Sequence, residues 1–313
     1  MSDVKKIATR EAYGEALAEL GAIYPNIVVL DADLAGSTKT AVFRNAFPDR
    51  HFNCGIAEGN MMSIAAGLAA AGMIPFASSF AMFASGRAYE QIRNSIGYPA
   101  LNVKIGASHG GISVGEDGAS HQCLEDMALM RMIPGMVVMC PADYVEAKLA
   151  VKAAVEHDGP VYMRFGRSPV PVIFPEDYDF RIGKGNVLRE GTDVSILANG
   201  LCVAEALVAG EMLAKEGISA EIINICTIKP LDDELVVKTA SKTGRIVTVE
   251  EHSIIGGLGG AVAECLAEKC PTRMYRIGIR DEFGQSGPAA ALLHMYGLDA
   301  EGICRQVKEF LRS

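Results

Sequence analysis

The sequence predicts an α/β protein of two domains, each a mostly parallel sheet flanked by helices, on three observations. Short β-branched or apolar runs alternate with amphipathic stretches of helical length. Runs that are apolar throughout are typical of strands buried on both faces, and their alternation with helices favours parallel sheets with right-handed crossovers. The 313 residues suffice for about two domains of roughly 150 residues each. Prolines and closely spaced glycines interrupt the alternation between Arg167 and Thr192, which indicates a linker.

The predicted strands lie on both sides of that linker. In chain order they are Ile27–Leu30, Leu101–Ile105, Met136–Met139, Val161–Met163, Val194–Leu197, Ala220–Ile225 and Arg245–Val249. The interruption divides a domain at residues 1–170 from a second at residues 192–313, with residues 171–191 as the linker. Both sizes are ordinary for independently folding domains.

The composition excludes some partners. Lysine and arginine number 29 and aspartate and glutamate 38, so the net charge is −9. Nucleic acid is therefore not an expected partner, because binding by counterion release needs a basic surface. The apolar window from Met61 to Met73 is too short for a membrane span, and the N-terminus lacks the apolar core of a signal peptide. We expect a cytoplasmic protein with no membrane partner, whose eight scattered cysteines are buried, reduced thiols.

Glu58 lies just before the N-terminal end of the apolar helix predicted from Met61 to Gly72. An acid in the first helical turn complements the helix macrodipole, a contribution of about 0.3–1 kcal/mol. An acid among small apolar residues can instead hold a proton for catalysis. Similarly, Phe80 and Phe83 are three residues apart and are predicted to share a helical face, either in the core or as a flat surface against a heteroaromatic ring.

The loop Ser108–Gln122 is the most informative segment. It holds four glycines, two acids and two histidines, His109 and His121, directly after a predicted strand. Loops at the carboxyl ends of parallel strands bind ligands in α/β proteins, which makes this loop a candidate site rather than a surface loop that tolerates histidine. The spacing of the histidines matches no metal motif, so we expect no metal site in this chain alone.

Two further segments leave alternatives open. Arg164 and Arg167 end the last strand of the first domain, where they can bind a phosphate or carboxylate or form surface ion pairs. The run Gly256–Gly260 resembles a phosphate cradle but lacks the third glycine of G-x-G-x-x-G, so close packing of a helix against a strand is the better interpretation.

Taken together, these segments resemble the transketolase family of thiamine-diphosphate enzymes. Gly55-Ile-Ala-Glu58 resembles the family's Gly-Ile-Arg-Glu-His, and the run from Gly115 to Gln122 resembles its Gly-Glu-Asp-Gly-Pro-Thr-His-Gln. The runs Asp31–Ser37 and Ile7–Arg10 also match family motifs. The resemblance covers the pyrimidine-binding and C-terminal domains, about half of a full-length transketolase.

The missing half decides what the resemblance implies. Family members hold Mg²⁺ and the diphosphate in an N-terminal domain marked by Gly-Asp-Gly, a tripeptide that does not occur in this chain. The resemblance therefore implies the C-terminal subunit of a split transketolase. Such a subunit is expected to be catalytically inactive by itself and active in a heterotetramer with an N-terminal subunit that carries the diphosphate and Mg²⁺ site. It also implies two-carbon ketol transfer between sugar phosphates, as in pentose phosphate metabolism.

The resemblance also assigns roles residue by residue. Glu58 matches the glutamate that hydrogen-bonds the aminopyrimidine of thiamine diphosphate. The remaining matches are Phe80, Phe83 and Asp33 for the cofactor pocket; His109 and His121 for donor oxygens and proton transfer; Asp117 for a donor hydroxyl; and Arg10, Ser37 and Arg167 for the acceptor phosphate. A third family aromatic falls at Gly86, so the resemblance implies an aromatic surface that is either thinner there or completed by the neighbouring Arg87.

Two other functions stay in competition. The second hypothesis is a related enzyme, either a deoxyxylulose-phosphate synthase or the beta subunit of a 2-oxoacid dehydrogenase. The Gly115–Gln122 run fits transketolase better than the synthase. A non-catalytic regulatory subunit is the third, favoured by Gly86 and disfavoured by the intact acid, histidines and arginines.

Overall fold

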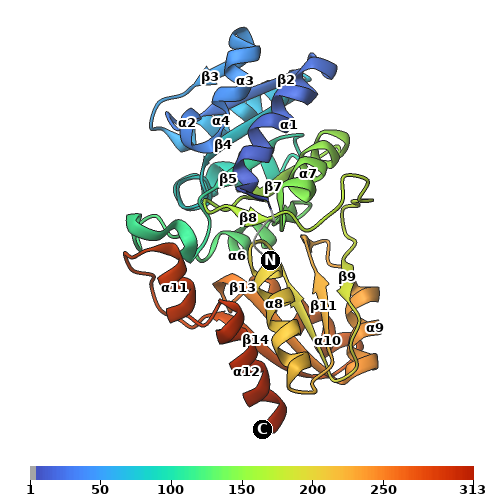
Figure 1. Cartoon of the computed structure of the whole chain (residues 1–313). Helices are drawn as coiled ribbons and strands as arrows, with labels where there is room; N and C mark the ends of the chain where they lie inside the picture. Colours follow the sequence, from blue (N-terminus) through green and yellow to red (C-terminus); the bar gives the residue numbers. More distant parts are fainter. Residues whose placement is uncertain (1–4) are drawn as a thin grey trace.

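The computed structural model describes residues 5–313. Figure 1 shows two α/β units one above the other, with the blue-to-green N-terminal part above and the yellow-to-red C-terminal part below. Each unit has a central, mostly parallel sheet with helices on both faces. The predicted fold class is confirmed.

The first unit has a seven-stranded sheet, in which successive apolar residues along a strand point to opposite faces. In sheet order its strands are β12 (Thr227–Lys229), β6 (Val137–Met139), β7 (Val161–Arg164), β5 (Lys104–Ser108), β4 (Ile74–Phe80), β2 (Ile27–Asp31) and β3 (His51–Asn53). Helices α1 (Thr9–Ile23), α3 (Ala41–Ala46) and α7 (Tyr144–Glu156) pack on one face. Helices α4 (Glu58–Ala70) and α6 (Asp126–Arg131) pack on the other, where the predicted apolar helix lies.

The second unit has a five-stranded sheet. In sheet order its strands are β14 (Arg273–Ile279), β13 (Arg245–Ser253), β10 (Val194–Ala198), β11 (Ala220–Asn224) and β9 (Asn186–Arg189), of which only β9 is antiparallel to its neighbour. Helices α8 (Cys202–Lys215) and α12 (Ala300–Arg312) cover one face, and α9 (Asp233–Thr243) and α10 (Leu258–Lys269) cover the other. Strand β9 falls within the expected linker, residues 171–191.

Several segments connect the two units. Strand β12 comes from the C-terminal part of the chain but pairs antiparallel with β6 of the first sheet. Strands β1 (Lys6–Ile7) and β8 (Val170–Pro171) form a small antiparallel ladder. Helix α11 (Ala289–Met295) packs against the 3₁₀ turn Ile112–Asp117, as Figure 1 shows. The histidine loop of the first unit is therefore held against the second unit.

The strand boundaries differ from prediction around the site. Strand β4 was not predicted, and β5 begins three residues later than the predicted run. Phe80 consequently ends a strand instead of lying on a helix with Phe83. The segment Ile74–Phe80 contains Ala, Ser and Phe without alternation, and it becomes a strand because it fills the place between β2 and β5. The shorter helices are α2 (Ala35–Thr38) and α5 (Tyr89–Gln91), with 3₁₀ or π turns at Pro48–Arg50, Met82–Arg87 and Ile92–Gly97.

The glycine run before α10 serves packing, as predicted. A Cβ on Gly259 would lie 2.9 Å from both the Arg276 and Thr248 side chains, so only glycine lets α10 come this close to the sheet. The carboxylate of Glu250 accepts the N–H groups of Leu258 and Gly259 at 2.7 Å each, and so occupies the anion position at this helix end.

Two other predictions concern the thiols and the membrane. All eight cysteines are free, six of them buried and two half-buried. Among residues 5–313, the helices are each too short or too polar to span a bilayer.

Candidate active site

The candidate residues gather at one edge of the first sheet. Strands β2, β4 and β5 run parallel, so their carboxyl ends, at Asp31, Phe80 and Ser108, lie at the same edge. Ligands of open α/β sheets bind beyond these ends. Here the loops after the three strands converge with the N-terminus of α4.

Glu58 is the first residue of α4 and is only 3% exposed. Its Oε1 lies 3.4 Å from Nη1 of Arg87, whose own side chain is half exposed. The carboxylate is thus buried at a helix N-terminus, where the macrodipole favours negative charge, with a single cation beside it. Such an acid can accept a hydrogen bond from a ligand or exchange a proton with it.

An aromatic wall, formed by Phe80, Phe83 and His109, lies in the same region. The Phe80 and Phe83 rings are 5.8 Å apart and 23° from parallel, and the His109 ring stacks on Phe80 at 3.9 Å. Phe83 lies in the π-helical turn Met82–Arg87, which also places the Arg87 guanidinium 4.2 Å from the Phe83 ring. π-Helical turns are frequent at functional sites because they redirect side chains.

The two histidines both contact the phenylalanine rings of this wall. His109 is 4% exposed, and its Nδ1 lies 2.9 Å from the Ser108 hydroxyl. His121 is half-buried and meets the Phe83 ring edge-on at 5.2 Å. The structure therefore brings together the two histidines that the sequence separates by twelve positions.

His109 is held in its neutral form. Burial, and then the positive charges of Arg10 and Arg167, lower the pKa of His109 from 6.5 to about 3. A neutral imidazole can donate one N–H and accept one hydrogen bond, so near pH 7 His109 can bind an oxygen atom without carrying charge.

Arg10 and Arg167 form a positive pair next to His109. Burial lowers the pKa of Arg10, and the neighbouring Arg167 lowers it further. Nη1 of Arg10 donates to the Ser37 carbonyl at 2.8 Å, while Arg167 contacts Glu116 at 3.2 Å and the Val114 carbonyl. Ser37 thus contributes its backbone carbonyl to Arg10. Two neighbouring guanidinium groups, of which only Arg167 is bonded to an exposed acid among the described contacts, are suited to bind an anion.

Three further sequence candidates lie outside this cluster. Asp117 is exposed, and Asp33 is exposed with its carboxylate accepting from Asn53 at 2.9 Å. Among the described contacts, neither acid touches the aromatic wall. Arg164, considered for phosphate binding or a surface ion pair, does neither, because it is buried and bonded to Asp126 at 3.0 Å.

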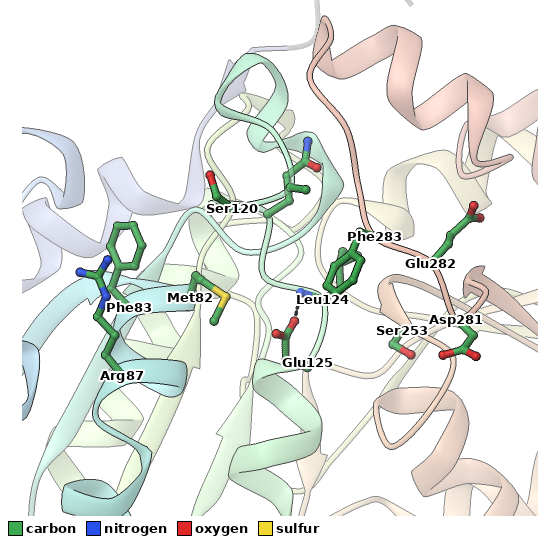
Figure 2. Close-up of a pocket in the computed structure, with 12 residues that line it drawn as sticks. Met82, Phe83, Arg87, Ser120, Leu124, Glu125, Ser253, Asp281, Glu282 and Phe283 are labelled. Carbon is green, nitrogen blue, oxygen red and sulfur yellow. Dashed lines mark hydrogen bonds between the residues drawn. The ribbon is translucent and has the colours of Figure 1, made fainter.

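A cavity of about 610 Å³ opens beside Phe83 and extends to the second unit. Figure 2 shows Met82, Phe83 and Arg87 on one side and Asp281, Glu282 and Phe283 on the other, with Leu124 and Glu125 between them. The candidate site is therefore bordered by both units and open on one side.

The sequence did not predict the hydrogen bonds between this site and the second unit. Nε2 of Gln122 donates to the carbonyls of Ile112, Gly115 and Gln285, and the Glu251 carboxylate accepts the Ser113 N–H. Gln122 stood inside a recognised motif, but Glu251 lies in an apolar strand and gave no local signal. The sequence suggests Arg87 as a residue that completes the aromatic surface, but it gives no sign of the contact with Glu58.

Comparisons with known proteins match this arrangement. Two family models, described as the transketolase pyrimidine-binding domain and the transketolase C-terminal domain, match residues 5–172 and 183–303. A protein of Methanocaldococcus jannaschii, provisionally named as a transketolase C-terminal section, is 55% identical over 97% of this chain and 96% of its own length. A transketolase subunit of Clostridium sp. strain MSTE9, named for 6-deoxy-6-sulfo-D-fructose, is 46% identical over 96% of this chain and 93% of its own length.

Structural comparison leads to the same family. A solved structure described as a split gene transketolase, inactive beta4 tetramer, superposes with a TM-score of 0.91 at 55% identity, covering 98% of this chain and 99% of that one. Human transketolase is 39% identical over 97% of this chain, but the match spans only 49% of the human protein. The chain therefore belongs to the transketolase family, which uses thiamine diphosphate, and comprises the family's pyrimidine-binding and C-terminal domains.

Proposed function

We propose that this chain is the pyrimidine-binding subunit of a two-chain transketolase, which moves a two-carbon ketol unit from a ketose phosphate to an aldose phosphate. The observation that carries the proposal is the buried Glu58 at the head of α4, which Arg87 connects to the wall of stacked aromatic rings. We divide the chain at residues 171–191 into the pyrimidine-binding and C-terminal domains, and we expect it to act in the cytoplasm.

The proposal includes a second, N-terminal chain. Relatives of the same length are named as subunits or sections, and the Gly-Asp-Gly of the diphosphate site does not occur among the 313 residues. We expect the partner to hold the diphosphate and Mg²⁺, and the two chains to form a heterotetramer with two copies of each.

The residues at the sheet edge fit the organic half of thiamine diphosphate. A buried carboxylate beside flat aromatic rings offers both a hydrogen-bond acceptor and a stacking surface, as an aminopyrimidine requires. When bound, the cofactor supplies a nucleophilic carbon and an electron sink for cleavage of a carbon–carbon bond. In our proposal Glu58 hydrogen-bonds the pyrimidine ring nitrogen and shares a proton with it, Phe80 and Phe83 orient the ring, and Asp33 lines the pocket.

The histidines and arginines act on the sugar. His109, as a neutral donor, binds a carbonyl or hydroxyl oxygen, and His121, edge-on to Phe83, exchanges a proton with the substrate. We assign Asp117 to a donor hydroxyl, and Arg10, Arg167 and the Ser37 segment to the terminal anion. That anion is a phosphate in our proposal, and a sulfonate, as in the name of the Clostridium relative, has similar chemistry.

The test is reconstitution with an N-terminal partner chain, thiamine diphosphate and Mg²⁺. We expect ketol transfer with the pair and none with either chain alone. Full activity of this chain without a partner contradicts the two-chain proposal, and inactivity of the pair with phosphorylated and sulfonated ketoses contradicts the assignment. Pyruvate consumption with release of CO₂ identifies a deoxyxylulose-phosphate synthase or 2-oxoacid dehydrogenase activity instead, and activity that survives loss of Glu58 identifies a regulatory subunit.

A further inference from the structure

The backbone that carries His109 adopts an uncommon conformation. His109 has φ of +59°, in the left-handed region that residues with a Cβ seldom occupy, and Gly111 has φ of +89°. A non-glycine residue is strained in this region, and the conformation persists only where the surroundings hold it. The position of the His109 ring against Phe80 therefore depends on whatever fixes the next few residues.

Those residues rest on two buried side chains. A Cβ on Gly110 would lie 2.4 Å from Nε of Arg164, and a Cβ on Gly111 would lie 2.3 Å from Oε2 of Glu251. Both glycines are thus in direct contact with charged groups that leave no room for a larger residue. Arg164 in turn donates to the Glu251 backbone carbonyl at 3.0 Å, so its side chain is tied to the strand that carries Glu251.

Glu251 also makes the hydrogen bond that fixes the loop after His109. Its Oε2 accepts the backbone N–H of Ser113 at 3.1 Å, across 138 positions of sequence. Glu251 lies in β13, the strand of the second sheet that ends at the boundary between the units. A side chain of the second unit therefore contacts the first unit and fixes the backbone of Gly111–Ser113.

The neighbouring acid, Glu250, is bonded within its own unit, unlike Glu251. Glu250 and Glu251 are both buried, and burial raises the pKa of Glu250 to about 7 and that of Glu251 to about 6. Glu250 accepts two N–H groups of α10 within its own unit. Glu251 points out of its own unit to the histidine loop. Burying a carboxylate costs free energy unless it is well hydrogen-bonded. The contacts of Glu251 with Gly111 and Ser113 offset part of that cost.

We propose that Glu251 is a positioning residue for His109, and that through it the C-terminal domain sets the geometry of the active-site loop. Glu251 acts through Gly111 and Ser113 and touches no substrate. This inference rests on the proposed function for its catalytic consequence, but the anchoring itself is a property of this chain alone. It also gives the C-terminal domain a role in a site whose predicted cofactor residues all lie in the first domain.

The first test measures amide hydrogen exchange of the chain without a partner. Glu251→Met keeps the length of the side chain and removes the carboxylate, and Glu250→Met is the matched control on the same strand. We expect Glu251→Met to increase exchange at Gly111–Ser113 by about tenfold or more, since the bonded Ser113 amide becomes free. Glu250→Met should increase exchange at Leu258 and Gly259 and leave Gly111–Ser113 protected. Glu251→Gln, which retains an acceptor oxygen, should restore part of the protection.

The second test uses the reconstituted pair. We expect Glu251→Met to lower kcat at least about tenfold with an unchanged KM for thiamine diphosphate, because small displacements of a catalytic group reduce rate steeply. Glu251→Gln should recover most of the rate, and Glu250→Met should retain it at temperatures where the variant is folded.

These measurements separate the two proposals. If the wild-type pair shows no ketol transfer, the proposed function fails, while the exchange data still decide whether Glu251 anchors the loop. Unchanged protection of Gly111–Ser113 in Glu251→Met overturns the anchor. Equal effects of Glu250→Met and Glu251→Met on that segment and on kcat also overturn it, because they show general loosening of the domain.

Discussion

The Arg87 guanidinium lies 3.4 Å from the Glu58 carboxylate and stacks over Phe83 at 4.2 Å. One side chain therefore contacts both the buried acid and the aromatic wall of the candidate site. Gly86, where the family pattern has another aromatic, directly precedes Arg87 in the π-helical turn. The departure at Gly86 and the position of Arg87 thus belong to the same local structure.

We predict that Glu58→Gln lowers kcat of the reconstituted pair by about 10²–10⁴-fold, the usual contribution of a positioned acid or base. The amide keeps the size of the side chain but cannot exchange a proton in the same way. Steady-state kinetics with thermal unfolding as a folding check measure the effect. Glu156→Gln, at an exposed position of α7, is the control and should retain wild-type activity. A Glu58→Gln pair of wild-type rate contradicts the assignment of Glu58.

We predict that Arg87→Ala raises the KM for thiamine diphosphate about fivefold. The reason is the loss of a cation–π contact of about 1 kcal/mol together with the cation beside Glu58. Titration of the cofactor into the pair, followed by activity, measures it. Arg93→Ala removes an exposed arginine that contacts Asn94 and should leave the KM unchanged. If Arg87→Ala and Arg93→Ala behave alike, Arg87 has no part in the cofactor pocket.

We predict that Arg10→Gln and Arg167→Gln each raise the KM for a phosphorylated acceptor by about 10–100-fold, the effect of losing a charge-assisted hydrogen bond. An acceptor without a phosphate should be affected much less by either change. The comparison of both acceptors in each variant provides the control. Equal losses with both acceptors would show that the arginines serve the fold instead of the anion.

We predict that His109 stays neutral across the working pH range. Its pKa of about 3 means that the ring signals in NMR should not titrate between pH 8 and 5, and a midpoint near 6.5 contradicts the prediction. An anion bound to Arg10 and Arg167 should raise this pKa, because it offsets the charges that lower it. The lowered pKa of His109 also makes the free energy of unfolding depend on pH. The unfolded imidazole takes up a proton near pH 6.5 and the folded one only near pH 3, so the contribution of neutral His109 is present above pH 6.5 and is lost as pH falls toward 3.

We predict that Asp126→Ala destabilises the fold by about 3–5 kcal/mol, because it leaves Arg164 buried without its partner. Denaturant unfolding of the chain measures the free energy of unfolding. Asp179→Ala is the control, since Asp179 and Arg181 form an exposed pair whose loss should cost less than about 1 kcal/mol. Similar effects of the two substitutions would show that the Arg164 pair contributes no more than a surface contact.

Much of the fold could be read from local patterns. Runs such as Met136–Met139 and Val161–Met163 are apolar throughout because both faces of a parallel strand are covered, and strands β6 and β7 form there. Strand β4 escaped prediction, since Ile74–Phe80 lacks a period and owes its conformation to β2 and β5 on either side. Phe80 and Phe83 were expected to meet through a shared helical face, but they meet across the junction of a strand and a π-helical turn.

By itself, the sequence determined the α/β class, the family resemblance and the identity of Glu58, His109, His121, Arg10 and Arg167 as candidates, because these depend on local pattern and motif spacing. The tertiary structure decided which of them meet: Arg87 with Glu58, His109 with Phe80, and Glu251 with Ser113. The physical reason is that burial, pKa and hydrogen bonding depend on groups far apart in the chain, which become neighbours only when the two sheets are packed together.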